Sequence, residues 1–239
     1  MTGQLFDRSL LPDLRVRLIG ATQALLGDTI GLAEDEWQYP SGLPGWARAH
    51  VVCHLAQQAD RTVALAERLL RGERYLTWPI DEPDHDLEPL SRRRAVELQV
   101  SLDTSSGRLL ETFDKLAEAD WQAHLTTPLG SLPAVALAYA RLNEVILHHI
   151  DLRLGLTLTD LDVRVAAWLL EWNAERLNDR LRHCQVHLLA DEGADLVVGT
   201  GAPCAEVRGA TSSLLGWLTG RLGPEAVLGA EAVDLGGPL

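Results

Sequence analysis

Residues 131–154 read SLPAVALAYARLNEVILHHIDLRL, a segment with strong helical character. Ser131 is a residue type that often caps a helix at its N-terminus. Pro133 is tolerated in the first turn of a helix, where its missing N–H costs nothing. The segment therefore predicts one long helix that starts near Ser131 and continues to about Leu154.

Three more helices are predicted before this segment. Apolar residues recur at helical spacing from Leu10 to about Leu32, at Leu14, Leu18, Leu25 and Leu26. A second helix is expected from Trp46 to about Arg71. A third is expected from Ser91, read as its N-cap, to about Leu116, and the short stretch 121–130 is read as a loop. Four helices of about 20 residues predict an antiparallel four-helix bundle in residues 1–156.

The pattern changes after Gly155. Asp160 or Asp162 can cap a helix that reaches about Leu181. Short β-like runs follow, separated by glycine-rich turns, and a final helix is expected at about 211–222; the runs are 185–189, 196–199 and 205–208. Residues 157–239 are therefore predicted to form a smaller α/β domain, which makes the fold class α+β.

Composition excludes several classes of function. The net charge of −13 argues against a nucleic-acid partner, since phosphate binding needs a dense basic surface. No apolar run approaches the roughly 20 residues that span a bilayer, so no membrane partner is expected and a cytoplasmic location is predicted. The three cysteines (Cys53, Cys184 and Cys204) are widely spaced, which predicts buried thiols rather than a disulfide framework.

Histidine and glutamate side chains recur one turn apart on two predicted helices. Glu144 and His148 are four residues apart, and so are His50 and His54, so each pair shares a helix face. His149 points about 100° away from His148. Helix-surface hydrogen bonds or satisfied core histidines would explain each pair alone. Both together favour a metal site inside the bundle.

Two histidines and one glutamate leave an open position on a tetrahedral zinc ion, which is typical of catalytic rather than structural zinc. Such an ion lowers the pKa of a bound water or thiol. Iron(II) also accepts two histidines and one carboxylate. At this point the residues favour a metal centre with four candidate ligands: His50, His54, Glu144 and His148.

Two motifs and a weaker third carry a resemblance to a known family. Residues 43–56, LPGWARAHVVCHLA, resemble a helix-two signature of the mycothiol-dependent maleylpyruvate isomerases, of the DinB-like superfamily. Arg141, Glu144, His148 and Asp151-Leu152 match the family's pattern R-x-x-E-x-x-x-H-x-x-D-L. Residues 207–221 resemble its closing segment. The sequence departs at Gln57-Gln58, where relatives often have Arg-Asn.

The resemblance implies a DinB-like bundle followed by a small α/β domain. It implies zinc bound by His54, Glu144 and His148, and a basic residue near the C-terminus that is important for activity, here Arg221. His50 is then expected to support the ligands or to act as an acid–base group, with a packed core histidine as the alternative. Asp151 is expected either to orient a ligand or to cap the helix end.

The function implied is conversion of maleylpyruvate to fumarylpyruvate in gentisate-type aromatic degradation. Mycothiol adds as a thiolate to the double bond, the resulting single bond rotates, and the thiolate leaves again. Zinc would keep the sulfur deprotonated. Two alternatives stay open: a zinc-dependent mycothiol S-transferase acting on another electrophile, and a non-catalytic carrier of a small ligand. The partners expected are a small-molecule substrate and a low-molecular-weight thiol.

Overall fold

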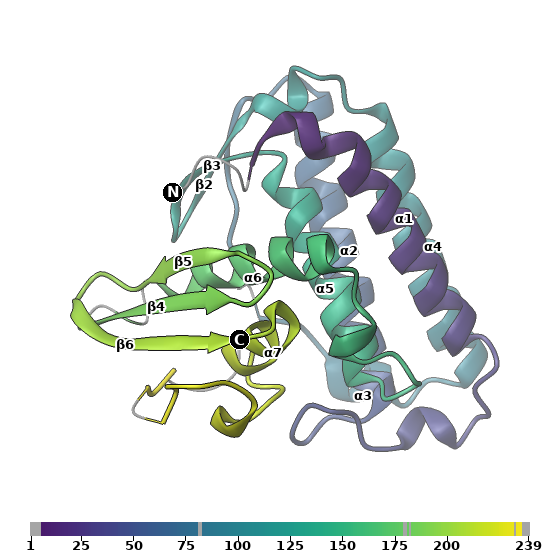
Figure 1. Cartoon of the computed structure of the whole chain (residues 1–239). Coiled ribbons are helices and arrows are strands. Elements are labelled where there is room, and N and C mark those ends of the chain that lie inside the picture. Colours follow the sequence, from purple (N-terminus) through teal and green to yellow (C-terminus); the bar gives the residue numbers. More distant parts are fainter. Residues whose placement is uncertain (1–5, 81–82, 179–180, 182, 232, 236–239) are drawn as a thin grey trace. The chain divides into compact units, whose positions relative to one another are not determined.

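The computed structural model describes residues 6–80, 83–178, 181, 183–231 and 233–235 (Figure 1). These residues form two compact units, which divide after residue 156. The first unit is mainly helical and the second combines helices with a small sheet. This is the predicted α+β fold class. Among the described residues, no helix has the length and apolar character needed to cross a membrane.

The first unit contains a bundle of four long helices (Figure 1). Helix α2 packs against α4 and α5, and α1 packs against α5 and α4. The helices are α1 (Leu11–Thr29), α2 (Arg48–Leu70), α4 (Ala95–Lys115) and α5 (Ala136–Asp151). The bounds of α1 and α2 and the ends of α4 and α5 lie close to those predicted. Helices α4 and α5 start further along the chain than predicted, at Ala95 and Ala136. The sequence pattern therefore predicts the bundle correctly.

Helix α5 is the most deeply buried helix of the bundle. Almost all of its side chains are excluded from water, including the polar ones of Arg141, Asn143, His149 and Asp151. Helices α1 and α2 pack against it. Their apolar side chains include Leu14, Leu18, Val51 and Leu55, each at 0% exposure. Each such fully buried side chain contributes about 1.5–3 kcal/mol relative to an exposed one. This packing fixes the polar residues of α5 in place.

The predicted start of the last bundle helix at Ser131 is wrong. Residues 124–133 form a hairpin of β2 (His124–Thr127) and β3 (Gly130–Pro133), and β1 (Tyr75–Thr77) lies parallel to β2. A two-residue turn needs so little chain that a hairpin fits into a stretch read as a loop. Thr127 stabilises the turn, because its hydroxyl bonds both the Leu129 N–H and the Gly130 carbonyl.

The prediction that Ser91 caps the third long helix is also wrong. Ser91 ends the short helix α3 (Leu87–Ser91), and its hydroxyl donates to the Glu88 carbonyl. Helix α4 begins at Ala95 instead. The carboxylate of Glu97 accepts the Arg94 N–H, and that of Glu34 accepts the Ala95 N–H. Two glutamates therefore do the capping that the sequence pattern assigned to a serine.

The second unit follows the predicted order of helix, strands and helix. Its elements are α6 (Val163–Leu177), β4 (Cys184–Ala190), β5 (Asp195–Val198), β6 (Ala202–Gly209) and α7 (Thr211–Leu218). The sheet order is β5-β4-β6, with β4 antiparallel to β5 and parallel to β6. Asp162 rather than Asp160 caps α6, since its carboxylate accepts the N–H groups of Arg164 and Val165.

Two of the three cysteines differ from the expectation of buried thiols. Cys184 and Cys204 form a disulfide between β4 and β6, and their Cα atoms are 5.6 Å apart. The pairing depends on the register of two strands that are separated by a third strand in the sequence, so spacing alone did not reveal it. Cys53 is a buried free thiol, as expected. Short 3₁₀ helices complete the fold at Arg8–Leu10, Glu36–Gln38, Asp120–Gln122, Leu158–Asp160 and Pro224–Ala226.

Candidate metal centre

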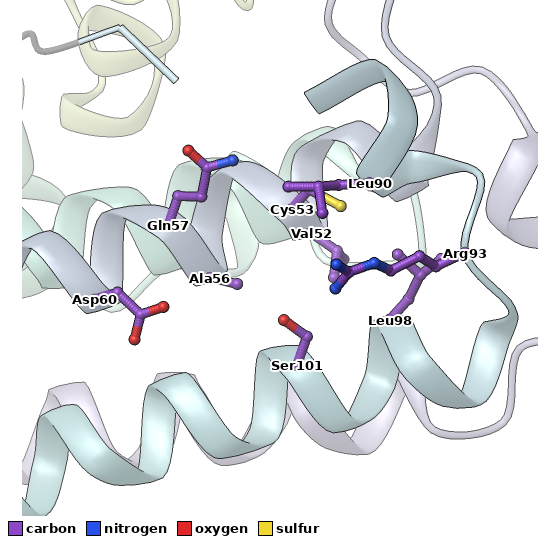
Figure 2. Close-up of a pocket in the computed structure, with 9 residues that line it drawn as sticks. All are labelled: Val52, Cys53, Ala56, Gln57, Asp60, Leu90, Arg93, Leu98 and Ser101. Atoms are coloured by element: carbon purple, nitrogen blue, oxygen red, sulfur yellow. The ribbon is translucent and has the colours of Figure 1, made fainter. Parts of the chain in front are cut away.

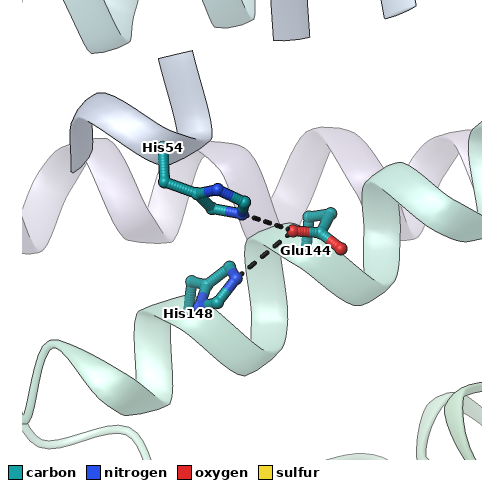
Figure 3. Close-up of side chains that lie close together, drawn as sticks. All are labelled: His54, Glu144 and His148. Atoms are coloured by element: carbon teal, nitrogen blue, oxygen red, sulfur yellow. Dashed lines mark hydrogen bonds and ion pairs between the residues drawn. The ribbon is translucent and has the colours of Figure 1, made fainter. Parts of the chain in front are cut away.

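Helices α2 and α5 bring His54, Glu144 and His148 together inside the bundle (Figure 3). The Nε2 atom of His54 lies 2.9 Å from Oε2 of Glu144, and Nε2 of His148 lies 3.2 Å from the same oxygen. The two imidazole rings meet edge to face, with their centroids 4.6 Å apart. The three residues that the resemblance selects as ligands therefore lie side by side.

The donor set fits a zinc ion. One potential ligand atom from each residue lies within 4.8 Å of the other two. Tetrahedral zinc with bonds of about 2.1 Å requires its ligand atoms to be separated by about 3.4 Å. The two separations that involve Glu144 are close to this value, so an ion between the three side chains needs little movement. Two imidazole nitrogens and one carboxylate oxygen are ligands that zinc prefers.

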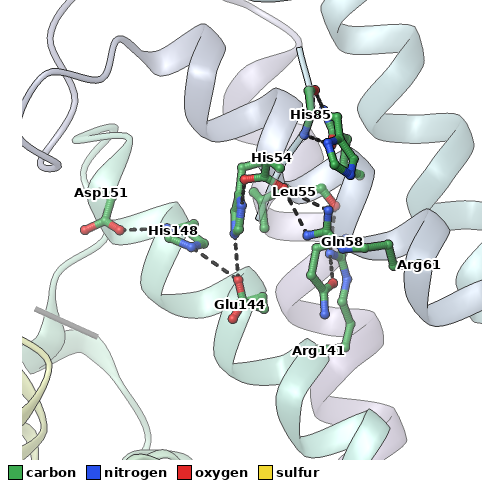
Figure 4. A network of polar contacts seen from close by, with 11 residues as sticks. His54, Leu55, Gln58, Arg61, His85, Arg141, Glu144, His148 and Asp151 are labelled. Atoms are coloured by element: carbon green, nitrogen blue, oxygen red, sulfur yellow. Dashed lines mark hydrogen bonds and ion pairs between the residues drawn. The ribbon is translucent and has the colours of Figure 1, made fainter. Parts of the chain in front are cut away.

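A carboxylate holds the second ring nitrogen of each histidine. Nδ1 of His54 lies 2.6 Å from Oδ2 of Asp84. Nδ1 of His148 lies 2.8 Å from Oδ2 of Asp151, and Figure 4 shows this second pair. Histidines that bind metals usually donate their other N–H to such a carboxylate, which fixes the tautomer and the ring orientation. Both histidines are therefore set to present Nε2 to an ion.

Hydrogen bonds outweigh burial in setting the charges of this cluster. Burial alone would raise the pKa of Glu144, but hydrogen bonds from His148 and His54 hold it well below its usual range. Burial would lower the pKa of His54, yet hydrogen bonds to Asp84 and Glu144 raise it to about 9. The cluster therefore keeps an ionised carboxylate at neutral pH, as a cation site requires.

Arg141 supports the cluster from one turn below Glu144 on α5. Its side chain is only 1% exposed. One guanidinium nitrogen donates to the Leu55 carbonyl at 2.9 Å and to Oε1 of Gln58 at 2.7 Å, and another donates to the Ser106 hydroxyl at 3.2 Å. These contacts tie α5 to α2 and α4 next to the candidate ligands. Figure 4 shows those with Leu55 and Gln58 of α2.

The loop before α2 covers the end of α5 that carries His148. The Gly42 N–H donates to the Asp151 carbonyl, so the loop contacts the residue that holds His148. The ring of Trp46 lies 5.7 Å, centroid to centroid, from the ring of His54. Gln38, residues 40–47 and Arg153 also line an open hollow of about 470 Å³. Trp46 therefore lines this surface hollow and also packs on the candidate ligand His54.

A second, smaller pocket of about 180 Å³ lies beside α2, between it and the residues of α3 and α4 (Figure 2). It is lined by Val52, Cys53, Ala56, Gln57, Asp60, Leu90, Arg93, Leu98 and Ser101. None of the three candidate ligands is among these residues. Burial raises the pKa of the Cys53 thiol to about 11, so Cys53 stays protonated at neutral pH. It is a poor nucleophile in this state.

Other residues singled out in the sequence lie apart from the cluster. Nδ1 of His50 accepts the Ala47 N–H, and its Nε2 contacts Glu88 at 3.0 Å and Ser91 at 3.2 Å, so both nitrogens are used at the start of α2. His149 is buried and bonds Asp28 of α1 at 2.9 Å. The acid–base role of His50 stays a prediction.

Arg221 lies in the second unit, just beyond α7. Gly220 adopts a positive φ of 71°, its N–H bonds the Trp217 carbonyl, and the Arg221 N–H bonds the Gly216 carbonyl. This is the Schellman pattern of helix ends, and it fixes the backbone from which the Arg221 side chain extends. The predicted role of Arg221 in activity stays a prediction.

Sequence reasoning missed Asp84 and Arg61. Asp84 comes 30 residues after His54 in the sequence and lies in a loop with several other acids, so no spacing marked it. Arg61 is two turns after His54 on the same face of α2. That spacing could have suggested a shared role for Arg61 and His54. The sequence does not show, however, that Asp84 bonds both of them.

A helical bundle with two histidines and one glutamate on facing helices defines a protein with a candidate catalytic metal centre. Residues 19–153 match the family described as the mycothiol maleylpyruvate isomerase N-terminal domain. The chain belongs to this family, as its motifs predicted. No curated protein matches it.

Two solved structures share the fold over nearly the whole length. One is a crystal structure of the mycothiol-dependent maleylpyruvate isomerase, with a TM-score of 0.79, 20% identity and 94% of each chain covered. The other is a variant of that enzyme with a histidine replaced by alanine, with a TM-score of 0.78, 19% identity and 94% of each chain covered. At this identity the likeness shows a common fold that includes both units.

Proposed function

We propose that this protein is a zinc- and mycothiol-dependent isomerase that converts maleylpyruvate to fumarylpyruvate. The observation that carries the proposal is the His54–Glu144–His148 cluster, in a bundle that belongs to the isomerase family. The solved structures that share its fold are named for this activity. The proposed setting is gentisate-type aromatic degradation in the cytoplasm, with a small acid and a thiol as partners and no nucleic acid or membrane.

The side chains of the cluster would supply three of the four ligands of a tetrahedral zinc ion. Zinc bound there would keep a thiol in its fourth position deprotonated at neutral pH. His54 and His148 supply Nε2, and Glu144 supplies negative charge. Asp151 holds the hydrogen on Nδ1 of His148. The chain thus provides three ligands and leaves the nucleophile to the cosubstrate, which suits a protein whose free cysteine is buried.

The reaction needs no net oxidation or reduction. The thiolate sulfur forms a bond to one carbon of the cis double bond, and the electron pair moves to the neighbouring carbonyl as an enolate. The remaining carbon–carbon single bond rotates. The enolate then restores the double bond and expels the thiolate, so that the cosubstrate is regenerated.

Arg221 is proposed to bind a carboxylate of the substrate through its guanidinium, which forms two parallel hydrogen bonds with such groups. His50 is proposed as an acid–base group or as support for the ligands. The support for Arg221 is its match to the family's closing segment and the fixed backbone at the end of α7. His50 is supported by its place one turn before His54.

The test is a direct assay. Zinc-loaded protein is incubated with maleylpyruvate, with and without mycothiol, and the appearance of fumarylpyruvate is followed. Catalysed isomerisation that requires both zinc and mycothiol is expected. A product that retains sulfur would identify a thiol transferase instead. Absence of any reaction, in protein with full zinc content, would reject the proposed activity.

A further inference from the structure

A continuous chain of polar contacts leads from Arg61 through Asp84 to His54. Oδ1 of Asp84 accepts N–H groups from both terminal nitrogens of Arg61, each at 3.0 Å. The other oxygen, Oδ2, lies 2.6 Å from Nδ1 of His54. The two oxygens are therefore divided between one guanidinium and one imidazole, and the Asp84 side chain is only 10% exposed.

The segment that carries Asp84 is attached to α2 by a third contact. The side-chain amide of Gln57 pairs with the backbone of His85, accepting its N–H at 3.0 Å and donating to its carbonyl. His54, Gln57 and Arg61 are three and four residues apart, so they lie on one face of α2. One helix face thus carries a candidate ligand and both side chains that hold Asp84 against it.

The two candidate histidine ligands differ in how their partners are supplied. Asp151 is three residues after His148 on the same helix, so the geometry of α5 delivers it. Asp84 is not placed beside His54 by helix geometry, because it comes from the loop between β1 and α3. Arg61 bonds the Asp84 carboxylate directly, and Gln57 holds the adjacent backbone of His85, so both attach this loop to α2 beside the His54 bond.

We propose that Asp84 is a positioning residue of the metal centre, which keeps the hydrogen of His54 on Nδ1 and so directs Nε2 to the ion, and that Arg61 positions Asp84. The inference rests on the proposed metal centre but not on the isomerase activity. Arg61 acts through Asp84 only, since both of its contacts with this group end on Oδ1.

The first experiment measures zinc affinity by competition with a chromophoric chelator. Asp84→Ala is expected to weaken zinc binding by about 10- to 100-fold, as is typical when such a partner is removed. Asp84→Asn is expected to weaken it less, because an amide oxygen still accepts the Nδ1 hydrogen. Arg61→Ala should have a smaller effect. The double variant should bind no more weakly than Asp84→Ala, since Arg61 then has nothing to position.

The matched control is Glu67→Ala. Glu67 also lies on α2 and pairs with an arginine, Arg108 of α4, at 2.7 Å, but contacts no candidate ligand. Its zinc affinity should equal that of the unaltered protein. Circular dichroism spectra of all variants establish that the helices are intact. A loss of zinc affinity in Glu67→Ala equal to that of Asp84→Ala would show a general effect on stability and overturn the proposal.

The second experiment observes the histidine ring nitrogens of zinc-loaded protein by ¹⁵N NMR. In Asp84→Ala only the His54 signals should move, while those of His148, which keeps Asp151, should not. If zinc binds normally and neither its affinity nor the His54 signals change in Asp84→Ala, the positioning role is rejected and the metal centre stands. If the unaltered protein binds no zinc, the metal centre fails and the positioning role fails with it.

Discussion

Arg141 shows how a single side chain connects the family motif to the fold. It is almost fully buried, and its hydrogen bonds end on a backbone carbonyl, an amide oxygen and a hydroxyl from two other helices. Burial lowers its pKa to about 10, so it stays charged at neutral pH. The arginine of the family motif thus makes structural contacts with α2 and α4, one turn before the candidate ligand Glu144.

Replacing Arg141 by lysine tests this arrangement. Lysine keeps the charge, but one ammonium group cannot reach all three acceptors, so at least one of these buried hydrogen bonds is lost. Arg141→Lys is expected to lower the free energy of unfolding by about 1–3 kcal/mol, measured by urea denaturation. Arg108→Lys, at an exposed ion pair, should change it by less than about 0.5 kcal/mol. Equal effects at both sites would contradict the role given to Arg141.

At the scale of elements, the C-terminal end of α5 depends on the loop that precedes α2. The last carbonyls of a helix lack partners within the helix. Here the Gly42 N–H donates to the Asp151 carbonyl, and the Arg48 guanidinium donates to the carbonyls of Leu152 and Arg153 at 2.9 and 3.2 Å. The loop and the first residue of α2 therefore cap the helix that carries two of the candidate ligands.

Gly42 is the position where this contact is most sensitive. A Cβ atom there would lie 3.2 Å from Cα of Asp151 and 3.3 Å from its Oδ1. Gly42→Ala should therefore displace the carboxylate that holds His148, weakening zinc binding several-fold and lowering stability by about 1–2 kcal/mol. Gly20→Ala, in α1 with open space around it, should instead raise stability by about 0.5–1 kcal/mol. Zinc titration and thermal unfolding of both variants check this; normal zinc affinity in Gly42→Ala would refute it.

Periodicity was enough to predict the four bundle helices and the order of elements in the second unit. It failed where local signals compete. Pro133 suits a first helical turn, but it ends a strand instead because Gly130, at a φ of 106°, begins the second arm of a hairpin. Ser91 suits an N-cap, but its hydroxyl is used by the preceding turn. Whether such a residue starts a helix or ends another element depends on contacts with residues distant in the sequence. A local sequence pattern does not reveal those contacts.

The candidate site was predictable only in part for the same reason. His54, Glu144 and His148 have helical spacings within each helix, and the family motif joins the two helices. Asp84 has neither a spacing nor a motif. It reaches His54 because Gln57 and Arg61 hold its loop, which becomes visible only when the chain is folded.

At the scale of the whole molecule, the residues proposed to act in function divide between the two units. The three candidate ligands and the carboxylates that hold them lie in residues 6–156, whereas Arg221 lies in the unit after residue 156. Among the described residues, the cluster of candidate ligands contains no side chain from the second unit. Metal binding and the contribution of Arg221 should therefore be separable by mutation.

Arg221→Ala is expected to bind one zinc ion as tightly as the unaltered protein while kcat/KM for isomerisation falls by about 100-fold, the effect of removing one member of a charged hydrogen-bonded pair. Arg208→Ala is the matched control, because Arg208 pairs on the surface with Glu206. It should retain activity. Zinc analysis and steady-state kinetics together decide the matter: loss of zinc from Arg221→Ala, or full activity in it, would contradict the expected outcome.

The hydrogen-bonded series from Arg61 to Asp151 has a consequence for charge balance. It contains three carboxylates, those of Asp84, Glu144 and Asp151, against one guanidinium and two imidazoles. With neutral imidazoles its formal charge is about minus two, which a divalent cation cancels. With the cation bound, the series is close to neutral. The first anion that binds to the ion therefore makes the site negative. A second anion, such as a carboxylate substrate, needs a cation from outside the series, and Arg221 is the residue proposed to supply it.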